Sequence, residues 1–225
     1  MIYSPLRRNK RPAVRVKSQH DGIFARAPTI LAIRKFWFGE NPDDAIVASQ
    51  QSVLWWGKDP ATDLQIKQRF ESTLLAAENN QLSDWKKTPR GALALVILTD
   101  QFPRNIYRDT PRSFSFDALA RSFCRIGLQT NFYNTLRPIE RSFLHLPLTH
   151  SELLADQDQS VALAAALVEQ VSASQKECFA GYLSFAIQHR DIIARFGRFP
   201  HRNRILQRQS TPQEQAFLQR PGSSF

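Results

Sequence analysis

Residues 91–102 read GALALVILTDQF, an apolar run that decides how the chain folds. A buried strand can have this composition, but strands usually span only about 4–8 residues. Thr88 and Pro89 come just before the run and form a helix cap and a first helical position. Pro103 follows the run, and proline cannot continue a regular helix. The run therefore predicts a central helix that is buried on all sides and ends at Pro103.

The segments on either side of this run also carry helical signals. Apolar residues recur at helical spacing, and only 8 of the 225 residues are glycine, too few for a turn-rich β protein. No segment has the alternating pattern of a strand, so the sequence predicts an all-α, antiparallel helical array. The expected helices run from Pro28 to Phe38, from Asp43 or Asp44 to Trp56, onward from the capping-box pair Thr62 and Gln65, from Thr110 and Pro111 to Gly127, from Pro138 to a break at Pro147, over residues 151–175, up to Gly197, and onward from Thr211 and Pro212.

The formal net charge is +10, and it is concentrated at the amino end. Residues 1–27 hold seven basic residues and one acid, a local net charge of +6 that leaves +4 for the rest of the chain. We expect residues 1–27 to form a basic flexible extension and residues 28–225 to form a single all-α domain. The chain has two cysteines and no apolar run near the roughly 20 residues that cross a bilayer. These features favour a protein of the reducing cytoplasm.

Two polar segments stand out against the apolar body. Residues 189–203 read HRDIIARFGRFPHRN, and helical periodicity places His189 on the apolar face. Its imidazole is then either a hydrogen-bonded core group or a working base. Asp100 falls in the buried helix, where a carboxylate needs cations or amide donors around it, and Arg104 follows closely enough to pair with it.

A third polar group follows Pro147. The break expected there leaves Thr149 and Glu152 at capping-box spacing at the start of the next helix. His150 would then lie beside the amino end of a helix, where backbone donors favour anions.

Four blocks of the sequence resemble a known bacterial family. They read WKKTPRGALALVILTDQFPRNIYRDTPR, ERSFLHLPLTHSE, HRDIIARFGRFPHRN and STPQEQAFL, and they are similar, in this order, to the family called domain of unknown function 924. The resemblance runs from about Ile30 to Leu218 and implies a tetratricopeptide-like helical fold with no established activity. The chain departs from the family pattern at Thr99, His145, Leu153 and Gln207, the last where a glycine usually follows the leucine.

Residues from these blocks form one set of candidates for a functional site. If the blocks meet, they make a pocket richer in cations than in acids, which suits a carboxylate or phosphate ligand. The catalytic candidates are His189 and His150, and the ligand-binding candidates are Asp100, Arg104, Asn105, Glu140, Arg141, Glu152, Arg198, His201, Arg202 and Asn203.

Three functions remain open on the sequence alone. The first is a binding module whose pocket holds an anionic small molecule or an acidic peptide or protein. The second is a hydrolase-type enzyme in which His189 or His150 is a general base oriented by one of the candidate carboxylates. The third, which the sequence does not favour, is nucleic-acid binding through the basic extension and the arginines of residues 202–208.

The sequence contains no fingerprint of a cofactor site. It has no P-loop, dinucleotide fingerprint or nucleophile elbow, and no HExxH or CxxC spacing. We therefore expect no cofactor and no metal.

Overall fold

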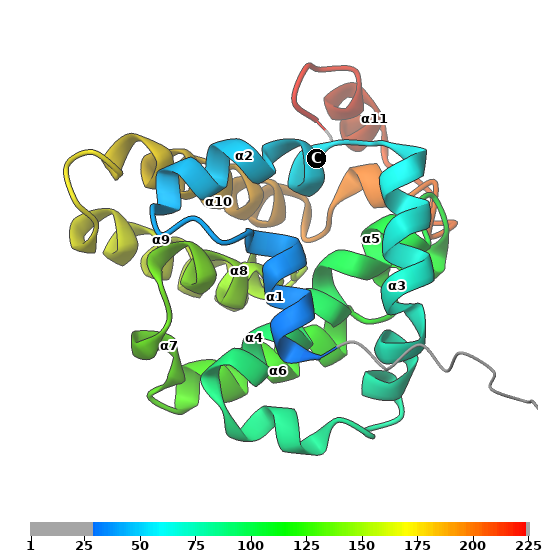
Figure 1. Ribbon diagram of the computed structural model, residues 1–225. Coiled ribbons are helices and arrows are strands. Elements are labelled where there is room, and N and C mark those ends of the chain that lie inside the picture. Colours follow the sequence, from blue (N-terminus) through cyan, green and yellow to red (C-terminus); the bar gives the residue numbers. More distant parts are fainter. Residues whose placement is uncertain (1–28, 224–225) are drawn as a thin grey trace, which may run out of the picture.

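The computed structural model describes residues 29–223, and within this part every regular element is a helix and no strand occurs (Figure 1). The all-α class is therefore confirmed, whereas the extension expected over residues 1–27 lies outside the described residues. None of the described helices is long and apolar enough to cross a lipid bilayer. The α-helices are α1 (Ile30–Phe38), α2 (Asp44–Trp56), α3 (Pro60–Glu78), α4 (Pro89–Val96), α5 (Phe102–Ile106), α6 (Asp117–Gln129), α7 (Phe132–Thr135), α8 (Pro138–Thr149), α9 (Leu154–Gln170), α10 (Lys176–Phe196) and α11 (Pro212–Leu218). Between them lie the 3-10 turns η1 (Ser83–Lys87), η3 (Pro111–Phe114) and η4 (Pro200–Arg202) and the π-helical segment η2 (Ile97–Gln101).

Three helices begin at caps that the sequence predicts, α1 at Thr29, α2 at Asp43 and α11 at Thr211. The Thr29 hydroxyl accepts the Ala32 N–H at the start of α1 (3.2 Å), and the Asp43 carboxylate caps α2 in the same way. α11 begins with a capping box formed by Thr211 and Glu214. These caps satisfy backbone donors that the first helical turn leaves without a partner.

The start of α3 differs from the prediction. Asp59, and not Thr62, is the capping residue, and Pro60 occupies the first helical position. The Asp59 carboxylate accepts the N–H and the hydroxyl of Thr62 (3.0 and 2.7 Å). The hydroxyl of Thr62 is therefore used inside the first turn and not as a cap.

The central run is buried as predicted, but it does not end at Pro103. α4 continues through η2 into α5, and Pro103 lies in the first turn of α5. In η2 the Phe102 N–H donates to the carbonyl of Ile97, five residues earlier, so the chain passes the proline through a π-helical turn. A proline is tolerated in the first turn of a helix because its missing N–H has no intrahelical role there. π turns often occur at functional sites, and this one carries Asp100.

The sequence predicts that this helix ends at Gly127, but α6 continues through Gly127 to Gln129. A Cβ atom at Gly127 would lie 2.8 Å from the side chain of Leu144 on α8. The glycine therefore permits the close approach of α6 and α8 and does not end a helix.

α8 does not break at Pro147. The helix continues for two further residues and ends at Thr149. His150 caps this carboxyl end. The expected capping box of Thr149 and Glu152 does not form, since α9 begins further along the chain. The side-chain amide of Gln157 instead donates to carbonyl groups at the end of α8 and just beyond it. His150 thus lies at a carboxyl end of a helix, and the prediction of an amino end was wrong.

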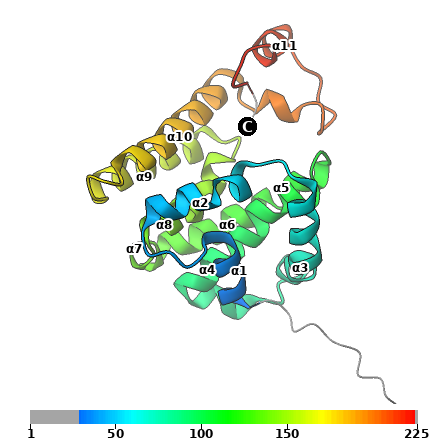
Figure 2. The same cartoon turned by 45° about the horizontal axis from the view of Figure 1, so that its top comes forward.

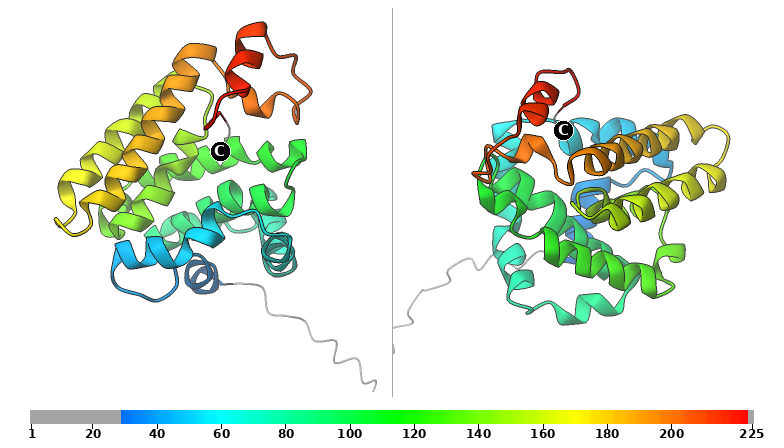
Figure 3. Two further views of the ribbon diagram at one scale, coloured as in Figure 1. Left: turned by 90° about the horizontal axis from the view of Figure 1, so that it is seen from above. Right: turned by 180° about the vertical axis from the view of Figure 1, so that it is seen from behind.

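Most buried apolar side chains form one core around α4. Figures 2 and 3 show α9 and α10 packed side by side, with the C-terminal segment (residues 197–223) beyond the end of α10. The tetratricopeptide-like repeat that the resemblance implies stays a prediction. A second, smaller cluster joins α10 to the C-terminal segment and consists of Ile192, Ile193 and Phe199, with Phe196 and Phe217 packed against them.

Gln207 has a left-handed backbone conformation, with φ of 55°. Glycine adopts this conformation without strain, whereas other residues rarely do. The resemblance described above implies a glycine at this position. The loop after Leu206 therefore makes the turn expected of a glycine, but Gln207 occupies that position and its backbone is strained.

Candidate ligand pocket

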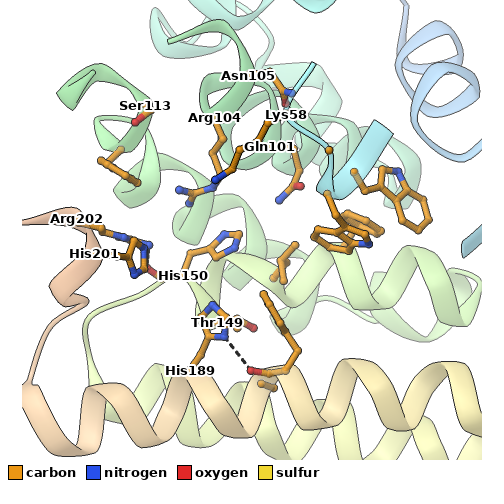
Figure 4. A pocket seen from close by; sticks show the side chains of 18 of the residues that line it. Lys58, Gln101, Arg104, Asn105, Ser113, Thr149, His150, His189, His201 and Arg202 are labelled. Atoms are coloured by element: carbon orange, nitrogen blue, oxygen red, sulfur yellow. Dashed lines mark hydrogen bonds between the residues drawn. The ribbon is translucent and has the colours of Figure 1, made fainter. Parts of the chain in front are cut away.

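A cavity of about 800 Å³ lies between α5, α8 and α10. Its walls come from the end of α2, from η2 and α5, from α8, from α10 and from the C-terminal segment (Figure 4). The volume falls in the range of pockets that hold small molecules, about 300–1,000 Å³. Parts of the chain that are far apart in the sequence therefore build one ligand-sized cavity.

The structure brings many of the predicted site residues together in this cavity. Figure 4 shows the side chains of Arg104, His150, His189, His201 and Arg202 grouped together, with Asn105 further from them. Asp100 lies directly behind the wall and contacts two of them. The predicted residues that line the cavity are Arg104, Asn105, His150, His189, His201 and Arg202.

The Asp100 carboxylate is fully buried and receives several donors. His150 Nδ1 lies 2.9 and 3.0 Å from its two oxygens, Arg104 Nη2 lies 3.3 Å away, and the Gln101 amide also donates to it. Burial alone would raise the pKa of Asp100, but His150 and Arg104 outweigh burial and hold the pKa well below its usual range. Asp100 is therefore an ionised carboxylate inside the protein.

His150 presents one ring nitrogen to Asp100 and the other to the cavity. Burial, together with the positive charge of Arg104, lowers the pKa of His150, so the imidazole is neutral near pH 7. A neutral imidazole carries one N–H, and the contact with an ionised carboxylate places it on Nδ1. Nε2 makes no hydrogen bond with any residue in the range 29–223, and its lone pair is available to the cavity.

Two arginines share the Asp117 carboxylate. Arg104 Nη2 lies 3.0 Å from one oxygen, and Arg202 Nη1 lies 3.1 Å from the other. The remaining Arg202 amine donates to the carbonyl of His150 (3.0 Å), and its guanidinium lies over the ring of Phe114 (4.7 Å). Burial and the neighbouring Arg104 lower the pKa of Arg202 to about 10, and the side chain stays charged.

Further basic side chains line the cavity, and they differ in whether a carboxylate already binds them. Arg108 is held by Asp63, with nitrogen–oxygen distances of 2.6 and 2.8 Å. Lys58 and Arg204 are exposed and form no ion pair within the described part of the chain. Arg104 Nη1 likewise makes no hydrogen bond with a described residue. These last three groups can donate to a ligand without losing an existing partner.

The other histidines of the cavity wall are neutral. Burial lowers the pKa of His189 to about 3, and its Nδ1–H donates to the Phe185 carbonyl (2.8 Å; Figure 4). Burial and Arg202 lower the pKa of His201 to about 3. Burial also lowers the pKa of His145 to about 4. His189 is only 2% exposed, so its position fits a core group better than a base.

Two of the predicted site residues hold α8 in place and do not reach the cavity. Glu140 forms an ion pair with Arg34 and accepts the N–H of Arg137 at the start of α8. Arg141 donates to the carbonyl groups of Leu136 and Asn134 (both 2.8 Å). The polar groups of Glu140 and Arg141 are therefore already hydrogen-bonded or ion-paired around the start of α8.

Three other predicted residues lie outside the cavity wall and make contacts that fasten the C-terminal segment to the body or hold it together internally. The Glu152 carboxylate accepts the N–H of Phe199 (2.8 Å) and pairs with Arg208 (2.7 Å). Arg198 pairs with Glu214 (2.6 Å), and the Asn203 amide donates to Ser210 (3.0 Å). Because Arg202 and Arg208 are both held in ion pairs, Arg204 is the exposed arginine of this loop.

The sequence did not single out Asp117 or the aromatic residues of the wall. Asp117 begins α6, and an acid at the start of a helix is ordinary. Paired tryptophans are more often core than ligand platform, and Trp55 is indeed buried, whereas Trp56 is 47% exposed. The aromatic side chains that line the cavity are Trp55, Trp56, Phe114, Phe143, Tyr182 and Phe185.

The fold and the cavity define an all-α protein of one domain with a ligand-sized pocket rich in arginine and histidine. Over residues 33–222 the chain matches the model of a family of bacterial proteins of unknown function, DUF924, and it belongs to that family. It is similar to the structure of a protein of unknown function, ATU0120, from Agrobacterium tumefaciens, with 35% sequence identity and a TM-score of 0.71. The match covers 84% of this chain and 96% of that one. A comparison with curated proteins gives no match. The resemblance inferred from the sequence blocks is therefore confirmed.

Proposed function

We propose that the pocket binds an anionic small molecule. The observation that carries the proposal is the placement of charge around the cavity. Five basic side chains line it against one acid, and the carboxylates that hold the arginines lie behind the wall. Charged donors at the surface of a partly enclosed cavity favour carboxylates and phosphates.

The available donors make the proposal specific. Arg104 Nη1 and the side chains of Lys58 and Arg204 are not committed to carboxylates of the described chain. Arg202 uses both terminal nitrogens internally, so it supplies positive charge without a direct contact. We therefore assign ligand contact to Arg104, Lys58 and Arg204.

The experiment is calorimetric titration with inorganic phosphate and with succinate at low ionic strength. The double variant Lys58→Ala, Arg204→Ala removes two exposed cations and leaves the buried network intact. A hydrogen bond to a charged group contributes about 1.5–3 kcal/mol, so the variant is expected to bind tenfold or more weakly. The matched control is Lys67→Ala, an exposed cation of α3 away from the cavity. Equal affinity of wild type and double variant would reject the assignment.

A second candidate function rests on the Asp100–His150 pair. Asp100 fixes Nδ1–H of a neutral imidazole, and Nε2 is left open to the cavity. This is the arrangement of a general base. We propose that a water molecule attacks a bound ester while Nε2 takes its proton and Asp100 stabilises the imidazolium that forms. The bond to the leaving group then breaks, and the imidazolium returns the proton to that group.

Hydrolysis of 4-nitrophenyl acetate and 4-nitrophenyl phosphate tests this candidate. His150→Gln retains an amide that can donate to Asp100 but removes the base, and it is expected to lower the rate by about 100-fold to 10,000-fold. Asp100→Asn should lower it through loss of the correct tautomer. Identical rates for wild type and His150→Gln, with phosphate binding retained in both, would exclude a general base at this position.

A further inference from the structure

Aromatic rings connect the exposed end of the cavity to its charged end. The ring of Trp56 lies 6.2 Å from that of Phe185, and Phe185 lies 4.0 Å from His189. His189 in turn lies 6.4 Å from His150, all measured between ring centroids. All four residues line the same cavity. The cavity therefore passes from an aromatic end at Trp56 to a polar end at His150.

Trp56 presents apolar surface that the protein does not cover. Its ring is stacked on that of Phe143, with 6.0 Å between centroids and 13° between planes. The side chain is nevertheless 47% exposed, while Arg202 at the polar end is 6% exposed. An exposed aromatic ring offers apolar area that a ligand group can bury.

Gly181 keeps space open at the aromatic end. It lies inside α10 and lines the cavity together with Cys178 and Tyr182. Glycine inside a helix is less stable than alanine. A Cβ atom built at Gly181 meets no heavy atom within 4 Å, so close packing does not require the glycine. Its lack of a side chain leaves volume that a ligand can occupy.

We infer that the natural ligand is amphipathic, an anion that carries an alkyl or aryl group. The anionic group lies near Arg104, and the apolar group lies along Phe185 toward Trp56 and Gly181. This inference rests on the proposed function and names the ligand class of the same pocket. A ligand of this kind satisfies the free donors and covers the exposed ring at the same time.

A series of straight-chain carboxylates tests the inference. Affinities of butanoate, hexanoate, octanoate and decanoate are measured by calorimetry, each below its micelle concentration, and matched alkyl phosphates give a second head group. Burial of one methylene contributes about 0.8 kcal/mol, so each added carbon should strengthen binding by about fourfold until the cavity is full. The stronger of the two series identifies the preferred head group, and either preference agrees with the inference.

Two variants place the alkyl chain. Gly181→Leu fills the aromatic end, and Trp56→Ala removes its exposed ring; both should weaken decanoate by tenfold or more and leave butanoate unchanged. Ile187→Ala is the matched control, because Ile187 is an exposed apolar residue of α10 that does not line the cavity. Unchanged affinity of decanoate in both variants would place the chain elsewhere and overturn the inference.

Two outcomes distinguish an error in the ligand class from an error in the proposed anion binding. If phosphate and succinate bind but chain length has no effect on affinity, the pocket holds a polar anion and the inference is wrong. If neither the short anions nor the alkyl series binds, the proposed function itself is wrong.

Discussion

Replacing Asp100 by alanine removes the acceptor of three donors at once. His150 Nδ1, the Gln101 amide and Arg104 Nη2 all contact this carboxylate, which is completely buried. A buried donor left without a partner costs about 1–3 kcal/mol, and a buried ion pair broken on one side costs about 3–5 kcal/mol. Arg104 keeps its contact with Asp117, so the losses do not simply add. We expect Asp100→Ala to lower the free energy of unfolding by about 3–5 kcal/mol.

The assay is urea unfolding followed by tryptophan fluorescence and by circular dichroism. Asp100→Asn keeps an acceptor oxygen for His150 and should lose less stability than Asp100→Ala. The control is Asp158→Ala, because Asp158 is 54% exposed and pairs with Arg190 at 3.0 Å. An exposed pair contributes at most about 1 kcal/mol.

The reasoning would be refuted by equal losses in Asp100→Ala and Asp158→Ala. The comparison holds only if the slope of the unfolding free energy against urea concentration is the same in all variants, since a changed slope indicates a changed denatured or native state. A small loss for Asp100→Ala would mean that the three donors find other acceptors in the cavity.

Three further outcomes follow from the structure. The free energy of unfolding should fall as the pH drops from about 6.5 toward about 4. The cavity histidines with pKa values of about 3 to 4 stay neutral in the folded state, whereas the unfolded chain binds protons. Urea unfolding at pH 7, 6 and 5 checks this, and equal stability at pH 5 and 7 would contradict it. Glu214→Gln weakens the paired contact with Arg198 (2.6 and 2.8 Å) and should cost about 1–3 kcal/mol, measured by thermal unfolding against wild type. Gln207→Gly relieves a left-handed backbone and should raise the free energy of unfolding by about 1 kcal/mol; a destabilised variant would show that the Gln207 side chain contributes more than the strain costs.

The fold could be predicted from the sequence where local chemistry decides it. Thr29, Asp43 and Thr211 cap helices because the donors they satisfy lie two or three residues away. The predictions at Pro103 and Gly127 were wrong for two different reasons. A π turn carries the chain past Pro103, and Leu144 occupies the place of a Cβ at Gly127.

The site could be predicted only in part, for a similar reason. Asp100 stands out because a carboxylate in an apolar run needs partners, and His150 proves to be one of them. Glu140 is an equally suitable site candidate by sequence, but it pairs with Arg34 and accepts a backbone N–H at the start of α8. Asp117 and Trp56 gave no signal, since an acid at a helix start and a paired tryptophan are both ordinary.

The C-terminal segment forms one wall of the pocket and packs on the end of α10 through a small apolar cluster. That cluster is separate from the main core, and Glu152 and Arg202 fasten the segment to the body. We expect a unit attached in this way to open at a lower free energy than the core does. Only molecules with the segment in place are competent to bind, so apparent affinity scales with their population. A substitution at Glu152, which touches no ligand, can therefore set the binding strength of the pocket by changing how often its wall is present.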